Sequence, residues 1–224
     1  MVQTNISERL HQIEAELKPF GARLVAVSKT HPPELIREAY DAGQRIFGEN
    51  RVQEATAKQP ELPEDIEWHL IGHLQTNKVK YIASFVAMIH GVDSLKLLQE
   101  IDKQGARNNR VIPCLLQFHI ASEETKFGLN EAEARELLES KEYAAMRHIS
   151  VQGVMGMASF TDDKNKVRNE FRHLKQTFDT LRQGYFSNTD AFREISMGMS
   201  GDYRIALEEG STMVRIGSAI FGQR

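Results

Sequence analysis

The chain has 224 residues, a length that suits one large domain or two small ones, and its 41% hydrophobic content is enough for a full core. The net charge of -3 includes no basic excess that would indicate nucleic-acid binding, and the lone cysteine, Cys114, excludes an internal disulfide and a multi-cysteine metal site. The polar N-terminus lacks a signal peptide and no apolar stretch reaches about 18 residues, so we expect a soluble, cytoplasmic protein.

The first predicted element is a helix over residues 6–17, with Thr4 or Asn5 as its N-cap and an apolar stripe at helical spacing. Strands and helices then alternate. Strands are predicted over 23–28, 45–50, 66–72, 87–93, 111–120, 149–157, 193–199 and 212–221. A helix follows each strand except the last, over 32–43, 52–59, 76–84, 94–105, 130–140, about 163–183 and 201–210.

This alternation predicts an α/β fold whose strands are parallel and joined by right-handed crossovers. Eight such units match a closed (β/α)8 TIM-type barrel better than an open sheet. The sequence therefore predicts one barrel domain over residues 1–224, with one extra helix before the first strand. Capping signals support two of the helices: Ser94 precedes one, and Asn130 with Glu133 has capping-box spacing at another.

Active residues of such barrels lie at the carboxyl ends of the strands. Two neighbouring strand ends, the last two, carry small and hydroxyl residues in the segments GMSGDY and VRIGSAIFG. Backbone N–H groups at small residues and the hydroxyls of serines bind phosphate oxygens well. The pair of segments favours a phosphate site at Ser200, Gly201, Gly217 and Ser218 over two ordinary turns.

Two cations stand at strand ends. Lys29 ends the first strand, where a neutral amine could form an imine with an aldehyde or ketone, or a charged one could pair with a carboxylate such as Glu49. Arg215 lies inside the apolar run MVRIGSAI and cannot lose its charge, so it needs either a structural ion pair or a ligand. His69 and His73 are four residues apart but lack the accompanying Glu of a zinc helix, so we expect no metal site.

A reactive lysine, a phosphate site and no metal indicate two classes of ligand. One is pyridoxal 5'-phosphate (PLP), which has an aldehyde and a phosphate on one ring. The other is a sugar phosphate in a lysine-dependent aldolase.

Six segments, taken in chain order, carry a family pattern: AVSKTHP, FGENRVQE, WHLIGHLQTNK, GVMGM, SMGMSGDY and VRIGSAIFG. Together they resemble the YggS/PROSC family, the pyridoxal phosphate homeostasis proteins, over about residues 5 to 222. The most specific motif is WHLIGHLQTNK, although Leu70 stands where the family more often has Phe.

The resemblance implies the alanine-racemase-like barrel of PLP proteins, with PLP as the cofactor. It implies that Lys29 carries PLP as an internal aldimine and that Arg215 faces the pyridine nitrogen. The remaining implied binding residues lie near the ring or the phosphate: Asn50, His69, Met199, Ser200, Gly201, Gly217 and Ser218.

An arginine at the ring nitrogen leaves that nitrogen unprotonated, so carbanions are poorly stabilised. We therefore expect a protein that binds PLP for homeostasis and delivery, with no catalytic residues and little or no turnover. The alternative is a racemase-like PLP enzyme, which needs a second acid/base such as His69 or a residue of another subunit. Because the chain ends at Arg224, soon after the last strand, we expect no further domain to supply that group.

The expected partners are PLP and, transiently, apo PLP-enzymes, without nucleic acid or membrane, and the expected state is a monomer. Lys78, Lys80 and Lys126 could relay the cofactor, although solvated surface lysines are the simpler interpretation. The polar segment 159–166 lies on the loop side where barrels carry function.

Overall fold

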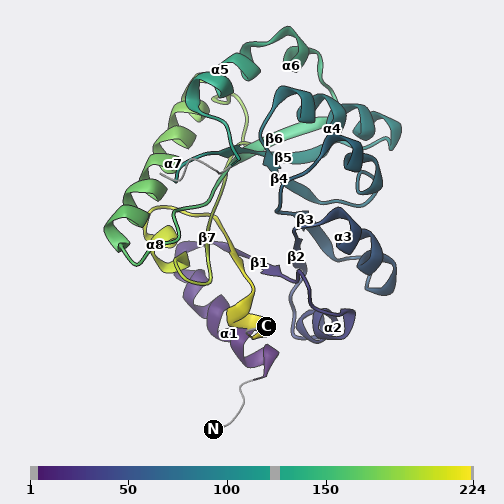
Figure 1. Ribbon diagram of the computed structural model, residues 1–224, viewed down its shortest axis with the longest axis vertical. Coiled ribbons are helices and arrows are strands. Elements are labelled where there is room, and N and C mark those ends of the chain that lie inside the picture. Colours follow the sequence, from purple (N-terminus) through teal and green to yellow (C-terminus); the bar gives the residue numbers. More distant parts are fainter. Residues whose placement is uncertain (1–4, 122–126, 223–224) are drawn as a thin grey trace.

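Eight parallel strands pair in chain order and close into a barrel through the pairing of the first with the last (Figure 1). The computed structural model describes residues 5–121 and 127–222. The strands are β1 (Arg23–Val27), β2 (Ile46–Glu49), β3 (Glu67–Leu70), β4 (Met88–Val92), β5 (Ile112–Phe118), β6 (Ile149–Gly156), β7 (Glu194–Met199) and β8 (Met213–Ile216). The predicted eight-stranded barrel is confirmed.

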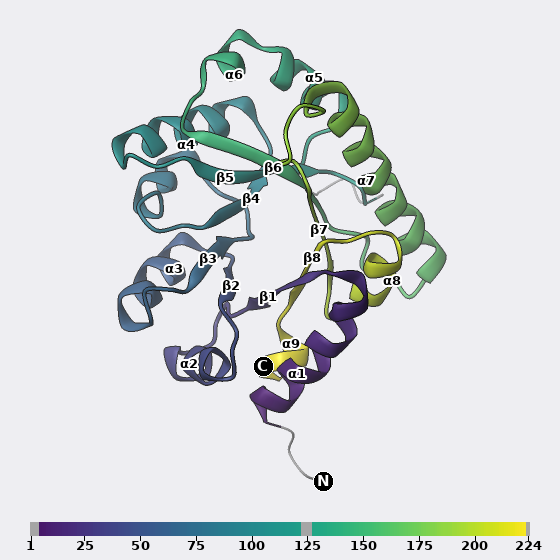
Figure 2. The same ribbon diagram turned by 180° about the vertical axis from the view of Figure 1, so that it is seen from behind.

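Helices surround the barrel on its outside (Figures 1 and 2). They are α1 (Ile6–Leu17), α2 (Pro33–Asp41), α3 (Val52–Lys58), α4 (Leu95–Arg107), α5 (Glu131–Glu139), α6 (Lys141–Ala145), α7 (Lys164–Tyr185), α8 (Tyr203–Glu208) and α9 (Ser218–Phe221). Three 3-10 turns accompany them: η1 (Lys18–Phe20), η2 (Gln59–Glu61) and η3 (Thr76–Tyr81). The extra helix α1 packs beside α9, so the two ends of the described chain meet (Figure 2).

Local capping chemistry explains where several helices begin. Asn5 caps α1 by accepting the N–H of Glu8 at 2.8 Å, and Ser94 caps α4 by accepting the N–H of Leu97. Asn130 and Glu133 form the complete capping box at α5, each side chain accepting the other residue's N–H. These three predicted helix starts are confirmed.

Two apolar layers hold the barrel together. Strand residues alternate between them because successive side chains point to opposite faces. Leu24 and Ala26 pack outward against α1 and α2, whereas Val25 and Val27 point inward. Each fully buried aliphatic side chain contributes about 1.5–3 kcal/mol. The inner layer consists of Val25, Val27, Ile71, Met88, Leu115, Met155 and Met213.

The predicted last strand, 212–221, is wrong in its second half. β8 ends at Ile216, and the backbone of Gly217 turns to φ -122° and ψ -71°. The N–H groups of Ile220 and Phe221 then donate to the carbonyl of Gly217, which starts α9. The apolar run continues past the strand because Ile220 is buried in the cluster that includes α1. Apolar residues alone therefore did not mark where the strand stops.

Two other segments differ from the sequence prediction. Residues 76–81 form the 3-10 turn η3 where an α-helix over 76–84 was predicted. A short helix, α6, follows α5 and was not predicted; Ser140 ends the first helix and caps the second by accepting the N–H of Tyr143. In the part of the chain that the structure describes, no helix is long and apolar enough to span a membrane.

β6 contains a bulge that depends on glycine. Cys114 of β5 pairs with Val151 and Leu115 pairs with Gly153, so Gln152 is an extra residue on β6. Gly153 has φ +153°, and a Cβ on it would lie 1.8 Å from the carbonyl oxygen of Glu194. No other residue fits this position without moving β7.

The variant Gly153→Ala tests this constraint. We expect it to lower the free energy of unfolding by about 3 kcal/mol or more, because the methyl group overlaps the β7 backbone. The matched control is Gly184→Ala in α7, where an added Cβ meets nothing within 4 Å. That control should raise stability by about 0.5–1 kcal/mol. Urea denaturation measures both, and similar effects for the two variants would contradict the argument.

Candidate functional site

A cavity of about 590 Å³ opens at the carboxyl ends of the strands. All the binding residues predicted from the sequence, except His69, line it. The residues around it are Val27, Lys29, His31, Asn50, Ile71, Met157, Phe160, Met199, Ser200, Gly201, Asp202, Arg215, Gly217, Ser218 and Gly222. Segments from both ends of the chain therefore form one site.

Lys29 enters this cavity from the end of β1. It lies in a turn in which the N–H of His31 donates to the carbonyl of Ser28 at 3.1 Å. Residues two apart on a strand share a face, so Lys29 follows Val27 into the cavity while Ser28 points outward. Lys29 and Arg215 come from neighbouring strands, since Val25 pairs with Arg215 across the β1–β8 closure.

Arg215 lies at the inner end of the cavity and is 4% exposed. Its Nη1 donates to Ser196 Oγ at 2.6 Å and its Nη2 donates to the carbonyl of Gly156 at 3.1 Å. Burial lowers the pKa of Arg215 to about 10, so the guanidinium is still charged at neutral pH. Its hydrogen-bond partners are neutral groups rather than the ion pair considered from the sequence.

A chain of buried polar groups continues from Arg215 through the barrel. His90 Nδ1 lies 2.9 Å from Ser196 Oγ, and His90 Nε2 lies 2.8 Å from His69 Nδ1. Because Ser196 Oγ accepts from Arg215, its own hydrogen is available to His90 Nδ1, which leaves the hydrogen on His90 Nε2 for His69. The chain thus runs from the guanidinium to two neutral imidazoles.

Both histidines are held neutral by their surroundings. Burial lowers the pKa of His69 from 6.5 to about 3. Burial, with the nearby His69 and Arg215, lowers the pKa of His90 well below its usual value. His69 is a buried member of this chain of polar groups and is not among the residues that line the cavity.

The rim of the cavity formed by the loops after β7 and β8 carries the residues predicted to bind phosphate. Ser200 follows β7, and its Oγ accepts the N–H of Gly217 at 3.3 Å, which joins the two loops. A Cβ on Gly217 would lie 3.1 Å from the carbonyl of Val27, so glycine allows β8 to approach β1 closely here. Gly201 and Ser218 complete a rim of hydroxyl and N–H donors.

Several lining residues were not found by sequence reasoning. His31 lies two residues after Lys29, and its ring packs on Phe221 with centroids 4.8 Å apart. Phe160 follows β6 and is fully exposed, at 101%. Its position in the segment 159–166 was the signal available in the sequence, since that segment was placed on the loop side. Ile71 and Met157 supply apolar wall.

Glu49, the carboxylate considered as a partner of Lys29, pairs with Lys58 instead. Glu49 is fully buried on the outer side of β2, where its Oε1 accepts from Lys58 Nζ at 2.7 Å. The same oxygen accepts from Ser28 Oγ at 2.7 Å. The Glu49 alternative is therefore replaced by a pair between β2 and α3.

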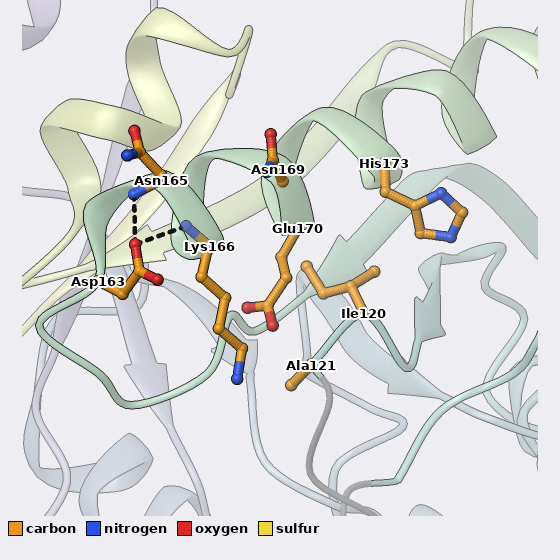
Figure 3. A pocket seen from close by; sticks show the side chains of 8 residues that line it. All are labelled: Ile120, Ala121, Asp163, Asn165, Lys166, Asn169, Glu170 and His173. Carbon is orange, nitrogen blue, oxygen red and sulfur yellow. Dashed lines mark hydrogen bonds between the residues drawn. The ribbon is translucent and has the colours of Figure 1, made fainter.

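A second cavity, of about 580 Å³, lies between the end of β5 and the start of α7 (Figure 3). Asp163 Oδ1 caps α7 by accepting the N–H groups of Asn165 and Lys166, shown dashed in Figure 3. This cavity contains none of the predicted binding residues. Its described walls are Ile120, Ala121, Asp163, Asn165, Lys166, Asn169, Glu170 and His173.

Two of the lysines considered as relays, Lys78 and Lys80, are not among the residues that line the barrel cavity. Lys78 and Lys80 are in η3, with their ammonium groups 5.7 Å and 5.0 Å from the centre of the Tyr81 ring. Lys126 lies outside the described residues. Among residues 5–121 and 127–222, no group of three or more His, Cys, Asp or Glu side chains is placed to hold a metal ion.

The neutral histidines make stability depend on pH. Below pH 6.5 His69 is protonated in the unfolded chain, whereas in the folded chain it stays neutral down to about pH 3. Stability is therefore full above pH 6.5 and falls as the pH decreases, by about 1.4 kcal/mol per pH unit for each such group. Urea unfolding between about pH 7 and pH 4.5 measures this slope.

The variant His69→Gln should show a shallower loss of stability than the unmodified chain over that pH range. The control His11→Gln changes an exposed histidine of α1 and should leave the slope unchanged. An unaltered slope in His69→Gln would contradict the buried neutral state.

Comparison with known proteins gives a consistent assignment. Residues 3–224 match the family model described as alanine racemase, N-terminal domain. The chain is 42% identical over 204 residues to a pyridoxal phosphate homeostasis protein of Aquifex aeolicus, covering 91% of this chain and 87% of that protein.

Solved structures agree with the sequence relatives. PipY of Synechococcus elongatus, solved without PLP, superposes with a TM-score of 0.90 at 37% identity, covering 97% of this chain and 100% of PipY. PipY with PLP bound gives a TM-score of 0.87 with the same identity and coverage. This chain therefore belongs to the YggS/PROSC family of pyridoxal phosphate homeostasis proteins, as its motifs predicted.

Proposed function

We propose that this chain binds PLP in the barrel cavity, holds it covalently through Lys29, and serves PLP homeostasis with little or no turnover. The observation that carries this proposal is the presence of a lysine, a buried arginine and a hydroxyl-bearing rim around one cavity. The chain's relatives are named pyridoxal phosphate homeostasis proteins, and PipY is solved with PLP bound.

The described residues fit such a ligand. The cavity of about 590 Å³ is within the range of small-molecule pockets, about 300–1,000 Å³. Apolar side chains of Val27 and Ile71 suit the faces of an aromatic ring. The hydroxyls of Ser200 and Ser218 suit a phosphate, and the charged Arg215 lies where a polar ring edge would need a donor.

PLP would supply an aldehyde, and Lys29 would supply the amine that holds it covalently, with loss of one water molecule. Arg215 would face the ring nitrogen as a hydrogen-bond donor, and its positive charge would disfavour a proton there. Asn50 and Met199, which line the cavity, would lie near the ring, and Gly201 and Gly217 would present backbone to the phosphate.

His69 supports this arrangement indirectly. Through His90 and Ser196 it holds the Nη1 of Arg215, so that the guanidinium keeps one orientation. A ring whose nitrogen is not protonated withdraws few electrons from bound substrate. The geometry at Arg215 therefore favours a carrier over an enzyme.

The alternative function, a racemase-like enzyme, requires an acid/base on the far side of the ring. His69 is too deeply buried to serve, and the described imidazole in the cavity wall is His31. Sustained racemisation or transamination of a common amino acid, abolished by His31→Gln, would favour this alternative. Absence of turnover with both proteins would favour the carrier.

The wider role is also a proposal. A covalent link through an imine is reversible, so a carrier can release PLP to apo-enzymes that bind it more tightly. A single barrel domain acting as a monomer in the cytoplasm is the expected setting.

The covalent link to Lys29 is the first prediction to test. After incubation with PLP, the purified protein should show a visible absorption band, and borohydride reduction should place a pyridoxyl group on Lys29 in peptide mass mapping. Lys29→Ala should lose the band and the adduct, whereas Lys78→Ala, a matched change in η3, should keep both. A protein left colourless and unmodified would bring the sugar-phosphate alternative forward.

The phosphate rim can be tested by comparing two ligands. The double variant Ser200→Ala with Ser218→Ala should weaken PLP binding by about tenfold or more, since two hydroxyl donors to a charged group are lost. Binding of pyridoxal, which has no phosphate, should change little. Spectroscopic titration with each aldehyde gives both affinities, and an equal loss for the two ligands would place the phosphate elsewhere.

A further inference from the structure

An ion cluster lies behind the barrel wall, next to the residues that flank Lys29. It consists of Glu49 at the end of β2 and Glu54 and Lys58 of α3, and we call it the α3 clamp. We propose that the α3 clamp positions Lys29 for its reaction by holding Ser28 and Thr30. This inference rests on the proposed function for its consequence, while the clamp itself needs no ligand.

The residue before Lys29 is held at two points. Lys58 Nζ donates to the carbonyl of Ser28 at 2.9 Å and to Glu49 Oε1 at 2.7 Å. Ser28 Oγ donates to the same Glu49 oxygen at 2.7 Å. Both the backbone and the side chain of Ser28 are therefore tied to β2 and α3, and all three side chains are less than 11% exposed.

Thr30, the residue after Lys29, is held in a backbone conformation that is unfavourable for threonine. Thr30 has φ +65°, the left-handed region, which a β-branched residue rarely adopts. Its N–H donates to Glu54 Oε2 at 2.7 Å, and that oxygen also lies 3.2 Å from Lys58 Nζ. Such strain persists where neighbouring groups enforce it, and it gathers at functional sites.

Stability alone does not explain the cluster. Burial raises the pKa of the Glu49 carboxyl despite its bonds to Lys58 and Ser28. Glu49 Oε2 is buried without a hydrogen-bond partner in the part of the chain that is described. A buried pair of this kind contributes little net stability compared with apolar residues of similar size. The geometry that it imposes on residues 28 and 30 is its distinctive effect.

The consequence for Lys29 follows from these anchors. The backbone of Lys29 lies between two fixed residues, Ser28 and Thr30, at the end of β1. The direction in which its side chain leaves the backbone toward the cavity is therefore also fixed. Covalent addition requires the reacting atoms in a narrow geometry, and displacements of about 1 Å slow such steps by up to about 100-fold. Release of Thr30 should therefore slow the reaction of Lys29.

The test compares three variants: two single substitutions of Glu54 and one double variant that also changes Thr30. In Glu54→Ala, the Thr30 amide should exchange its hydrogen faster, and the PLP absorption band should appear about tenfold more slowly. Glu54→Gln should keep both near normal, because the amide oxygen still accepts from Thr30. Adding Thr30→Gly to Glu54→Ala should restore the rate, because glycine adopts a positive φ without strain. In this double variant, the amide hydrogen of residue 30 should still exchange fast, because Glu54 no longer accepts it.

Controls separate positioning from simple stability. Glu64→Ala, an exposed change close to α3, should alter neither readout, and melting temperatures are measured for every variant. A Glu54→Ala protein with lower melting temperature but a normal rate would overturn the proposal, as would a slow rate that Thr30→Gly fails to rescue. If the unmodified chain forms no band, the proposed function fails; normal Thr30 exchange in Glu54→Ala would then overturn the clamp, and faster exchange would support it.

Discussion

The pairing of β1 with β8 is the contact on which the site depends. Arg23 to Ala26 pair in register with Met213 to Ile216, and this closure joins the first strand of the chain to the last. It places Lys29 and Arg215 around one cavity although 186 positions of the sequence separate them (215 minus 29). A slip of one residue would turn the side chains of one strand to the other face relative to its partner, so Lys29 and Arg215 would no longer share one cavity.

The buried charge of Arg215 determines which polar groups surround it in the interior of the barrel. A guanidinium cannot be neutralised by losing a proton at neutral pH, so its donors must find acceptors. Ser196 and the carbonyl of Gly156 supply them, and two neutral imidazoles extend the chain. These acceptors carry no negative charge. Burial lowers the pKa of Arg215, whereas the carboxylate of Asp202, which also lines the cavity, raises that pKa and so favours the charged form. Under the proposed function, the positive charge of Arg215 limits electron withdrawal by a bound ring, which supports the proposal of a carrier.

The barrel wall separates two polar systems with different chemistry. Inside, Arg215 and the histidines form a chain with one net charge. Outside, Lys58 pairs with both Glu49 and Glu54 in the α3 clamp. Ser28 and Lys29 are consecutive residues that face these two systems in turn, because side chains alternate along a strand. Lys29, the residue proposed to hold PLP, is therefore coupled through the backbone to the outer cluster while its side chain lines the inner cavity.

Local patterns in the sequence determined the eight strands, most of the helices between them, the caps at Asn5, Ser94 and Asn130, the strand-end residues and the family. They also predicted most of the cavity wall, because the carboxyl ends of parallel strands meet at one mouth. Only the tertiary structure decided that His69 lies beneath the site, that Glu49 pairs with Lys58, and that the last apolar run becomes α9. Those outcomes depend on which strands neighbour each other after closure, and the spacing of residues along one segment carries no information about partners across the barrel.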